Sequence, residues 1–393
     1  MCIKIIIVSL IVIFPSLSFS QSTGQMSDYV IESQSGVINA YSRSGLLKYT
    51  GTDAYTVIQS AINAVSTGNG GSIAVASGIY YLSNELTING WDSNTPPTKQ
   101  ITLTGNGYAT QLVQTTKGKN AIVVKNKASV VITGFYIYTG SVAKSGILLD
   151  DSGTNSNISV WGATIDNIFI QSNSTASPAF YAINFFSLNI PRLTAINSSN
   201  HGIILENTST TTNYGNSSFG LIIAGASSAP PYAGLYLKSS NSNGRHYLNL
   251  ITFQNYQCGF GYRGIYSTCS NFNTFNFVDI EGMPEPIVFD GNGKGGESRN
   301  NKVLSGYLLP STGGTAITNT LYTGGNDFNV FIEGDAKSKP ILDQQQYRPP
   351  NSYNVIVSNA NAAANINIKS KASTPLILRK GDATVTTHMP NIY

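Results

Sequence analysis

Charged side chains are scarce in this sequence. Asp, Glu, Lys and Arg make up 11% of the 393 residues, against roughly 25% in an average globular protein. Asn, Ser, Thr and Gly take over the surface, with 38 glycines in the chain. The net charge of +4 comes without a basic run or stripe, so nothing here indicates nucleic-acid binding.

Cysteine is nearly absent as well. Of the three cysteines, Cys2 lies in the leader discussed below, which leaves Cys258 and Cys269. A lone pair is no disulfide framework, and no Cys/His spacing is typical of a zinc site. The pair either forms one disulfide or stays unpaired, and the sequence leaves both alternatives open.

Long apolar runs are missing after the first residues. The chain begins MCIKIIIVSLIVIFPSLSFSQS, in which a lysine precedes an apolar run that Pro15 breaks. Ser18 and Ser20 are small residues at the two positions that a signal peptidase inspects. We therefore predict a signal peptide over residues 1–20, a secreted or periplasmic protein, and no membrane association after cleavage. The alternative is an uncleaved anchor.

Strong helix formers are sparse, and a helical pattern stands out in one place. Asp53 can cap a helix that Gly68 ends. Apolar residues recur between them at helical spacing: Ala54, Val57, Ile58, Ala61, Ile62 and Val65. Before it we expect an irregular lead-in over residues 21–50, and after it short strands over residues 72–75 and 79–82. Residues 51–393 are expected to form one domain.

What is abundant is a short repeated phrase. GILLDD, GIILEN, GLYLKS, GIYSTC and PIVFDG share an apolar alternation, and a second phrase recurs as LNLITFQN, FNFVDIEG, FNVFIEG and YNVIVSN. Variable spacing with a preserved phrase predicts an all-β solenoid whose coils add strands to long parallel sheets, with Asn and Ser stacking at the corners. A β-propeller or a jelly roll is the competing architecture.

The segment TDAYTVIQSAINA…GNGGSIAVASGIYYLSNELTI resembles the N-terminal region of the pectate-lyase-like superfamily. The likeness covers about 40 residues. The rest of the chain shares the general repeat pattern of the superfamily and none of its specific motifs. It implies a right-handed parallel β-helix whose N-terminal helix caps the solenoid. The superfamily includes lyases, glycoside hydrolases and phage tailspikes, so the fold alone does not assign an activity.

The repeat also predicts which side chains face outward on one sheet. Aligning the phrases puts six apolar residues at equivalent inward positions: Ile147, Ile183, Ile203, Leu235, Ile265 and Ile287. Because side chains alternate along a strand, the residues next to each inward one face solvent. Charged and aromatic residues then gather on one face. The candidate catalytic residues are Asp150, Glu206, His201, Lys238 and Arg263; the candidate substrate-binding residues are Tyr181, Tyr236, Tyr266 and Asp290.

Two chemistries are compatible with this face. Asp150 and Glu206 should lie two coils apart, about 9.6 Å, near the upper end of the carboxyl separation of an inverting glycosidase. A β-elimination would instead use Arg263, Lys238, Tyr236 and His201. Glu206 and Lys238 as a plain ion pair, and His201 as a plain turn residue, are the structural alternatives.

His201 also resembles the histidine of the Gly-His-Gly element in polygalacturonase-like hydrolases, and Asp150-Asp151 their paired aspartates. Asn200 stands where the first glycine would be, and the aspartates are two coils away instead of one. No cofactor is required by the sequence. One Ca²⁺ at Asp150, Asp151 and Asp166 remains an alternative.

The leading hypothesis is a secreted protein that cleaves a polysaccharide, by hydrolysis or β-elimination, along a groove on this sheet. Tyr236 and Tyr266 would stack on sugar rings. The alternatives are a carbohydrate-binding or adhesin-like β-helix without catalysis, and a structural surface protein. The sequence does not decide between a monomer and a homotrimer.

Overall fold

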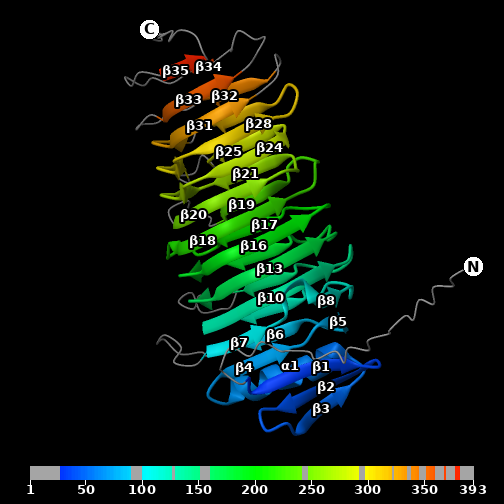
Figure 1. Ribbon diagram of the computed structural model, residues 1–393. Helices are drawn as coiled ribbons and strands as arrows, with labels where there is room; N and C mark the ends of the chain where they lie inside the picture. The colour runs from blue at the N-terminus through cyan, green and yellow to red at the C-terminus, as the bar shows by residue number, and fades with distance from the viewer. Residues whose placement is uncertain are drawn as a thin grey trace, which may run out of the picture.

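The computed structural model describes residues 27–89, 100–125, 129–150, 160–240, 247–291, 297–320, 323–333, 338–344, 351–358, 367–368 and 377–380. It is a right-handed parallel β-helix (Figure 1). Coils stack from the blue N-terminal end to the orange and red strands, and each coil adds strands to the same sheets. The predicted fold is therefore confirmed. In the described residues no helix is long and apolar enough to cross a membrane, and the predicted signal peptide lies outside them.

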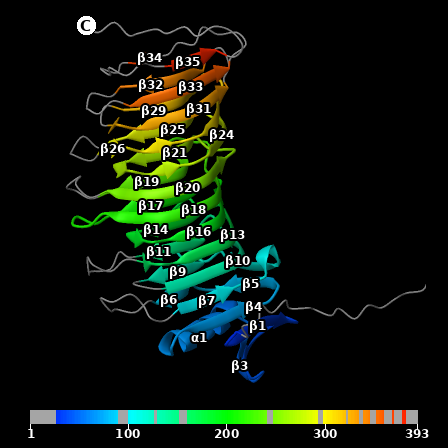
Figure 2. The ribbon, with the colours of Figure 1, turned by 60° about the vertical axis from the view of Figure 1, so that its left-hand side comes forward.

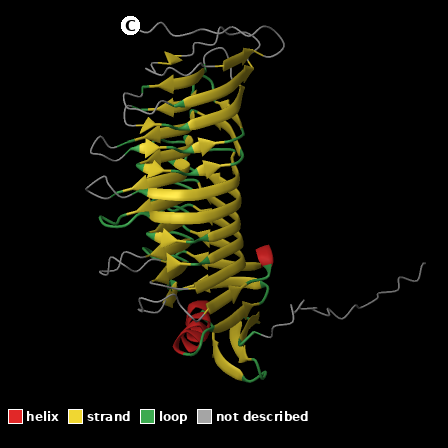
Figure 3. Cartoon of the chain, turned by 90° about the vertical axis from the view of Figure 1, so that its left-hand side faces the viewer, coloured by secondary structure: helices red, strands yellow, loops and turns green. Residues whose placement is uncertain are grey.

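The N-terminal end is closed by one α-helix and three antiparallel strands (Figures 1 and 3). Helix α1 (Ala54–Thr67) begins as predicted, because the Asp53 carboxylate accepts the backbone N–H groups of Tyr55 and Thr56. Its apolar side buries Val57, Ile58 and Ile62 against the first coil. This helix covers the core that the first coil would otherwise expose.

The lead-in is not irregular, which corrects the sequence-based expectation. Strands β1 (Tyr29–Gln34), β2 (Val37–Ser42) and β3 (Leu47–Gly51) form an antiparallel meander, and β1 also pairs in parallel with β4 (Gly71–Val75). The turn between β1 and β2 consists of Ser35 and Gly36, both with positive φ, as a two-residue hairpin turn requires. Residues 29–51 thus extend the sheet of the solenoid.

Within the described residues the smaller sheet, sheet B, has eleven parallel strands, one per coil (Figure 2). In order they are β6 (Leu86–Asn89), β9 (Ile122–Lys125), β11 (Ile147–Asp150), β14 (Phe180–Ile183), β17 (Ile203–Asn207), β19 (Ala233–Ser239), β21 (Arg263–Thr268), β25 (Glu285–Asp290), β29 (Thr315–Asn319), β32 (Lys339–Asp343) and β34 (Asn367–Ile368). The G-I-x-L phrases form these strands.

The larger sheet, sheet A, holds the remaining strands and the second repeated phrase. Its main strands are β4, β7 (Gln100–Thr104), β10 (Ser129–Thr139), β13 (Thr164–Ser172), β16 (Asn189–Asn197), β18 (Tyr214–Gly225), β20 (Leu248–Cys258), β24 (Val278–Met283), β28 (Gly306–Pro310), β31 (Asp327–Glu333), β33 (Ser352–Ser358) and β35 (Ile377–Lys380). Shorter strands flank them: β5 (Gly78–Leu82), β8 (Thr110–Gln114), β12 (Val160–Trp161), β15 (Phe185–Phe186), β22 (Ser270–Asn271), β23 (Thr274–Phe275), β26 (Ser298–Arg299), β27 (Lys302–Val303) and β30 (Thr323–Gly324); a 3-10 turn, η1 (Gly107–Ala109), precedes β8.

The core between the sheets repeats from coil to coil. Phe219, Phe253 and Phe275 stack with ring centroids 4.8 Å and 4.7 Å apart. At one corner, buried asparagines form a ladder in which the side-chain oxygen of each accepts the backbone N–H of the equivalent residue one coil before it. Its members are Asn273, Asn301, Asn326 and Asn351. The predicted stacking of corner asparagines is thus confirmed.

The two cysteines do not form a disulfide. Both are buried and neither is disulfide-bonded. They lie at opposite ends of β21, because Cys258 ends the preceding strand β20 and Cys269 follows Thr268. Six residues of strand span about 20 Å, far beyond the reach of a disulfide. The unpaired alternative is the correct one.

Candidate functional site

The outer face of sheet B carries the predicted residues, with one correction to the register. Ile147 is in register with Phe180, and Phe180 with Ile203. Ile183, which the repeat placed beside Ile147, instead pairs with Glu206 at the end of the strand. This shift moves Tyr181 into the outward column of Ile204, Tyr236 and Tyr266.

A second outward column lies two residues further along each strand, at the carboxyl edge of sheet B. It runs Asp150, Ile183, Glu206, Lys238, Thr268 and Asp290. Asp150 and Glu206 are therefore two coils apart, as predicted. Four of these six side chains are charged, in a chain with very few charges.

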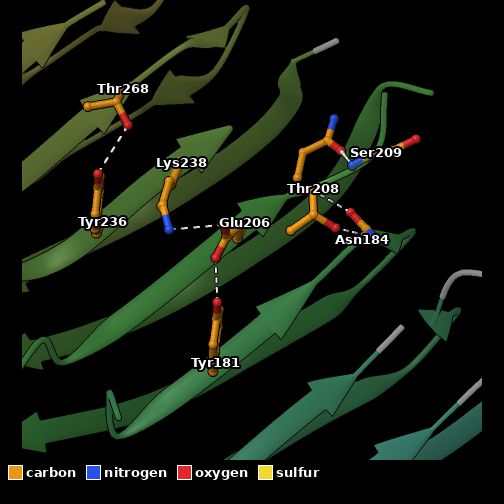
Figure 4. Close-up of polar contacts among 9 residues, drawn as sticks. Tyr181, Asn184, Glu206, Thr208, Ser209, Tyr236, Lys238 and Thr268 are labelled. Atoms are coloured by element: carbon orange, nitrogen blue, oxygen red, sulfur yellow. Dashed lines mark hydrogen bonds and ion pairs between the residues drawn. The ribbon is translucent and has the colours of Figure 1, made fainter. Parts of the chain in front are cut away.

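Glu206 is the centre of the face (Figure 4). Its side chain is 5% exposed, yet it is bonded from two sides: Lys238 Nζ lies 3.0 Å from Oε1, and the Tyr181 hydroxyl donates to Oε2. The two partners come from the neighbouring strands β14 and β19, so three successive coils build the cluster. Both oxygens of this buried carboxyl group thus have a charged or polar partner, as a buried polar group requires.

Tyr181 lies between the two carboxylates. Burial raises its pKa, and the negative charges of Glu206 and Asp150 raise it further. The phenol therefore keeps its proton at neutral pH and remains a hydrogen-bond donor. Asp150 is half-buried at the end of β11, and its register partner on β9 is Lys125.

His201 is buried just before β17, where it is 8% exposed. Its Nδ1 accepts the backbone N–H of Ala233 at 3.0 Å, which leaves the ring proton on Nε2. Burial, followed by the charges of Lys238 and Arg263, lowers the pKa of His201 to about 4. The neutral ring is thus a donor through Nε2, and it serves poorly as a base.

The aromatic side chains of this face stack on each other. The ring of Tyr236 lies between His201, with centroids 5.1 Å apart, and Tyr266, at 4.7 Å and an interplanar angle of 21°. The Arg263 guanidinium lies 4.2 Å from the Tyr266 ring centroid. The expected stacking of sugars on Tyr236 and Tyr266 therefore does not fit, because neighbouring side chains already pack on their ring faces. Ring edges and hydroxyl groups remain for a ligand.

The outer members of the face are paired too. Arg263 Nε is 2.6 Å from Glu285 Oε2 on the next coil. The Tyr266 hydroxyl donates to Asp290 Oδ2 at 3.3 Å, while the other Asp290 oxygen accepts from Thr320 and from Gly291 N–H. Arg263 is consequently neutralised in place, and Asp290 is held rigidly.

No metal centre is evident on this face. Among the described residues, no three His, Cys, Asp or Glu side chains lie close enough together to hold an ion. Asp151, one member of the calcium alternative, is outside the described residues. Asp166 lies on β13 in sheet A, 3.5 Å from Arg192, so it does not share the face of Asp150.

Sequence reasoning assigned no contact to two threonines and one asparagine of the site. Thr268 donates to the Tyr236 hydroxyl at 3.3 Å. At the end of β14, Asn184 exchanges two hydrogen bonds with Thr208, both of 2.8 Å (Figure 4). Such residues are frequent everywhere in this chain, so their type carried no signal. The predicted alignment already placed Thr268 on the strand next to that of Tyr236, but it did not indicate this hydrogen bond.

Neither a family model nor a curated protein sequence matches this chain. Solved structures do match in fold. The A-module of the Azotobacter vinelandii mannuronan C-5 epimerase AlgE6 is 12% identical, with a TM-score of 0.49, over 81% of this chain and 93% of that one. ORF18 of Geobacillus virus E2 is 16% identical, with a TM-score of 0.46, over 79% of this chain and 59% of that one.

Tailspike protein 2 of bacteriophage CBA120 is 13% identical, with a TM-score of 0.42, over 81% of this chain and 46% of that one. This chain thus spans about half the length of the two phage proteins. The parallel β-helix that the first-coil phrase predicted is the architecture observed here. At these identities the likeness concerns the fold and carries no assignment of activity.

Proposed function

We propose that this protein is secreted and hydrolyses a polysaccharide bound along the outer face of sheet B. Glu206 and Asp150 would be the catalytic carboxyl groups. The observation that carries this proposal is the buried Glu206, bonded to Lys238 and Tyr181 on a solvent-facing sheet. An ion pair removed from water is weak as a stabilising device, which favours a functional reason for its burial.

The arrangement favours different roles for the two carboxyl groups. Lys238 and Tyr181 stabilise the carboxylate of Glu206, so Glu206 would act as the base that takes a proton from the attacking water. Asp150, two coils away, would give its proton to the glycosidic oxygen. A separation of about 9.6 Å for two coils leaves room for that water and corresponds to inversion at the anomeric carbon.

The test is a polysaccharide screen with residues 21–393, in which new reducing ends and the ultraviolet absorbance of unsaturated uronates are followed together. We expect reducing ends without absorbance. Glu206→Gln and Asp150→Asn should each lower kcat at least about 100-fold, the usual size of a general acid or base contribution. Full turnover in both variants would overturn the assignment.

The chain offers a matched control in Glu333→Gln. Glu333 also accepts a hydrogen bond from a tyrosine of the preceding coil, Tyr307, at 2.7 Å, but it lies on sheet A. This variant makes the same chemical change in the same kind of contact, so its activity should equal that of the wild type.

Carbohydrate binding without catalysis is the second candidate, and one observation favours it. Glu206, Arg263, Tyr266 and Asp290 are bonded to other side chains of the protein, as in a rigid recognition surface. In that case polysaccharide would be retained unchanged, and Glu206→Gln would weaken retention.

Absorbance at the wavelength of unsaturated uronates would instead indicate a lyase and direct attention to Lys238 and Arg263.

A further inference from the structure

The outer face of sheet A carries an aromatic surface near the N-terminal end. We call it the tyrosine face and define it as Tyr81, Tyr108, Tyr136, Tyr138, Phe169 and Gln171. The register brings these residues together: Tyr81 is aligned with Val113 and then Tyr138, and Tyr138 with Gln171. Tyr136 is aligned with Phe169 one row away.

Two of these side chains are unusually exposed. Tyr81 is 67% and Tyr108 62% exposed, the highest values among the large apolar and aromatic side chains that the structure describes. Tyr108 comes from the 3-10 turn η1, and its ring contacts that of Phe169 edge to face, with centroids 5.6 Å apart. Phe169 stacks on Tyr136 at 5.4 Å. The exposed Tyr108 ring therefore rests on a rigid aromatic base.

The hydroxyl groups of the face are already oriented. Tyr136 donates to Gln171 Oε1 at 2.6 Å, which leaves its oxygen lone pairs as acceptors toward solvent. Tyr138 accepts from Asn173 Nδ2 at 3.2 Å, which leaves its own proton as a donor. One acceptor and one donor thus stand two residues apart among aromatic rings.

No member of the tyrosine face is charged, and the nearest charged residues on β13 and β16, Asp166 and Arg192, neutralise each other at 3.5 Å. We propose that the tyrosine face binds a segment of uncharged polysaccharide. Sugars present apolar C–H patches flanked by hydroxyl groups, which match rings that alternate with oriented donors and acceptors. None of its six residues is a cation with which an anionic polymer could pair. This second site goes beyond the proposed function of sheet B and does not depend on it.

The test is affinity electrophoresis in native gels that contain xylan, β-glucan, galactomannan, pectin or alginate. All proteins carry Glu206→Gln, so that no polymer is cut during the run. Tyr81→Ala/Tyr108→Ala removes both exposed rings, and Tyr138→Phe removes one donor. Phe272→Ala is the matched control, because Phe272 is also an aromatic side chain outside this face and is 52% exposed.

We expect a neutral polymer to retard the parent protein and the Phe272→Ala variant equally. Each lost ring should weaken binding about tenfold, so the double variant should migrate freely, and Tyr138→Phe should be intermediate. Retardation that is unchanged in the double variant, that occurs with pectin or alginate alone, or that no neutral polymer causes would overturn the proposal. Tyr108-dependent self-association in sedimentation would overturn it in favour of a contact between two copies.

The outcome is separable from that on sheet B. With Glu206 intact, Tyr81→Ala/Tyr108→Ala should hydrolyse short oligosaccharides at the parental rate if sheet B is catalytic. If the double variant loses retardation in the gels while the protein with Glu206 intact hydrolyses nothing, the tyrosine face is supported and only the catalytic proposal is refuted.

Discussion

Replacing Lys238 by methionine tests whether Glu206 is buried as a charge. The substitution keeps the aliphatic length of the side chain and removes the ammonium group 3.0 Å from Glu206 Oε1. The carboxylate would then keep the Tyr181 hydroxyl as its main donor. Removing one partner of a fully buried ion pair costs about 3–5 kcal/mol.

Glu206 is buried, with 5% of its side chain exposed, but Lys238 is 34% exposed. The expected loss of stability is therefore smaller than for a fully buried pair. Water can reach one side of the vacated position, so we expect about 2 kcal/mol of destabilisation. Glu206→Gln should cost about 1 kcal/mol, since the amide still accepts from Tyr181. The double variant should also lose about 1 kcal/mol, because no unpaired charge is left.

The measurement is urea denaturation at pH 7, followed by circular dichroism, with Lys117→Met as the control on an exposed lysine. Two results would refute the reasoning. One is a Lys238→Met variant as stable as the control. The other is a double variant whose loss equals the sum of the two single losses, because the pair would then not be coupled.

Three further results are expected. The pKa of His201 is about 4 in the folded protein and about 6.5 in an unfolded chain, so the unfolded state binds the extra proton. As the pH falls from 6.5 to 4, wild type should lose about 3 kcal/mol more than His201→Asn; parallel pH profiles would contradict this. Asn301→Ala should cost about 3–5 kcal/mol in urea denaturation, since the backbone N–H and side-chain amide of Asn273 and the carbonyl group of Ser270 each lose their bond to the Asn301 side chain; a loss below 1 kcal/mol would contradict the ladder. Burial raises the pKa of the Cys258 thiol to about 12, so a thiol reagent should modify it in residues 21–393 only after unfolding, and modification of the native protein would contradict its burial.

The architecture could be predicted because its causes are local and repeated. The helix cap at Asp53, the apolar alternation of GIILEN and the corner asparagines each act within one coil and its neighbours. The lead-in was missed since its strands are short and polar, with few buried side chains. Its Ser35-Gly36 turn was the available signal.

The register error has a physical cause. Glycines open several sheet B phrases because a side chain would meet the neighbouring backbone there: a Cβ on Gly202 would lie 2.6 Å from the carbonyl oxygen of Gly225. Ala179 takes this position in the coil of β14. The glycine marker is missing in that coil, and alignment on Ile183 displaced Tyr181 from its column.

The composition of the site and the Glu206–Lys238 ion pair were predictable, whereas its ring contacts were not. Sequence placed Asp150, Glu206 and Lys238 on one face, because outward positions alternate regularly along each strand. Ring stacking across coils depends on rotamers and on the exact register. For that reason Tyr236 and Tyr266 were expected to receive sugars, although they pack against His201 and Arg263.

The asparagine ladder also bears on how such a molecule can change its length. Each ladder member meets its neighbours through the same amide contacts, so the junction between two coils does not depend on which coils they are. Excising residues 274–301, 28 residues or the length of one turn, would bring Asn326 next to Asn273 in an equivalent bond. Whole coils could therefore be duplicated or deleted as units, and the outer face of sheet B would lengthen or shorten in steps of one strand.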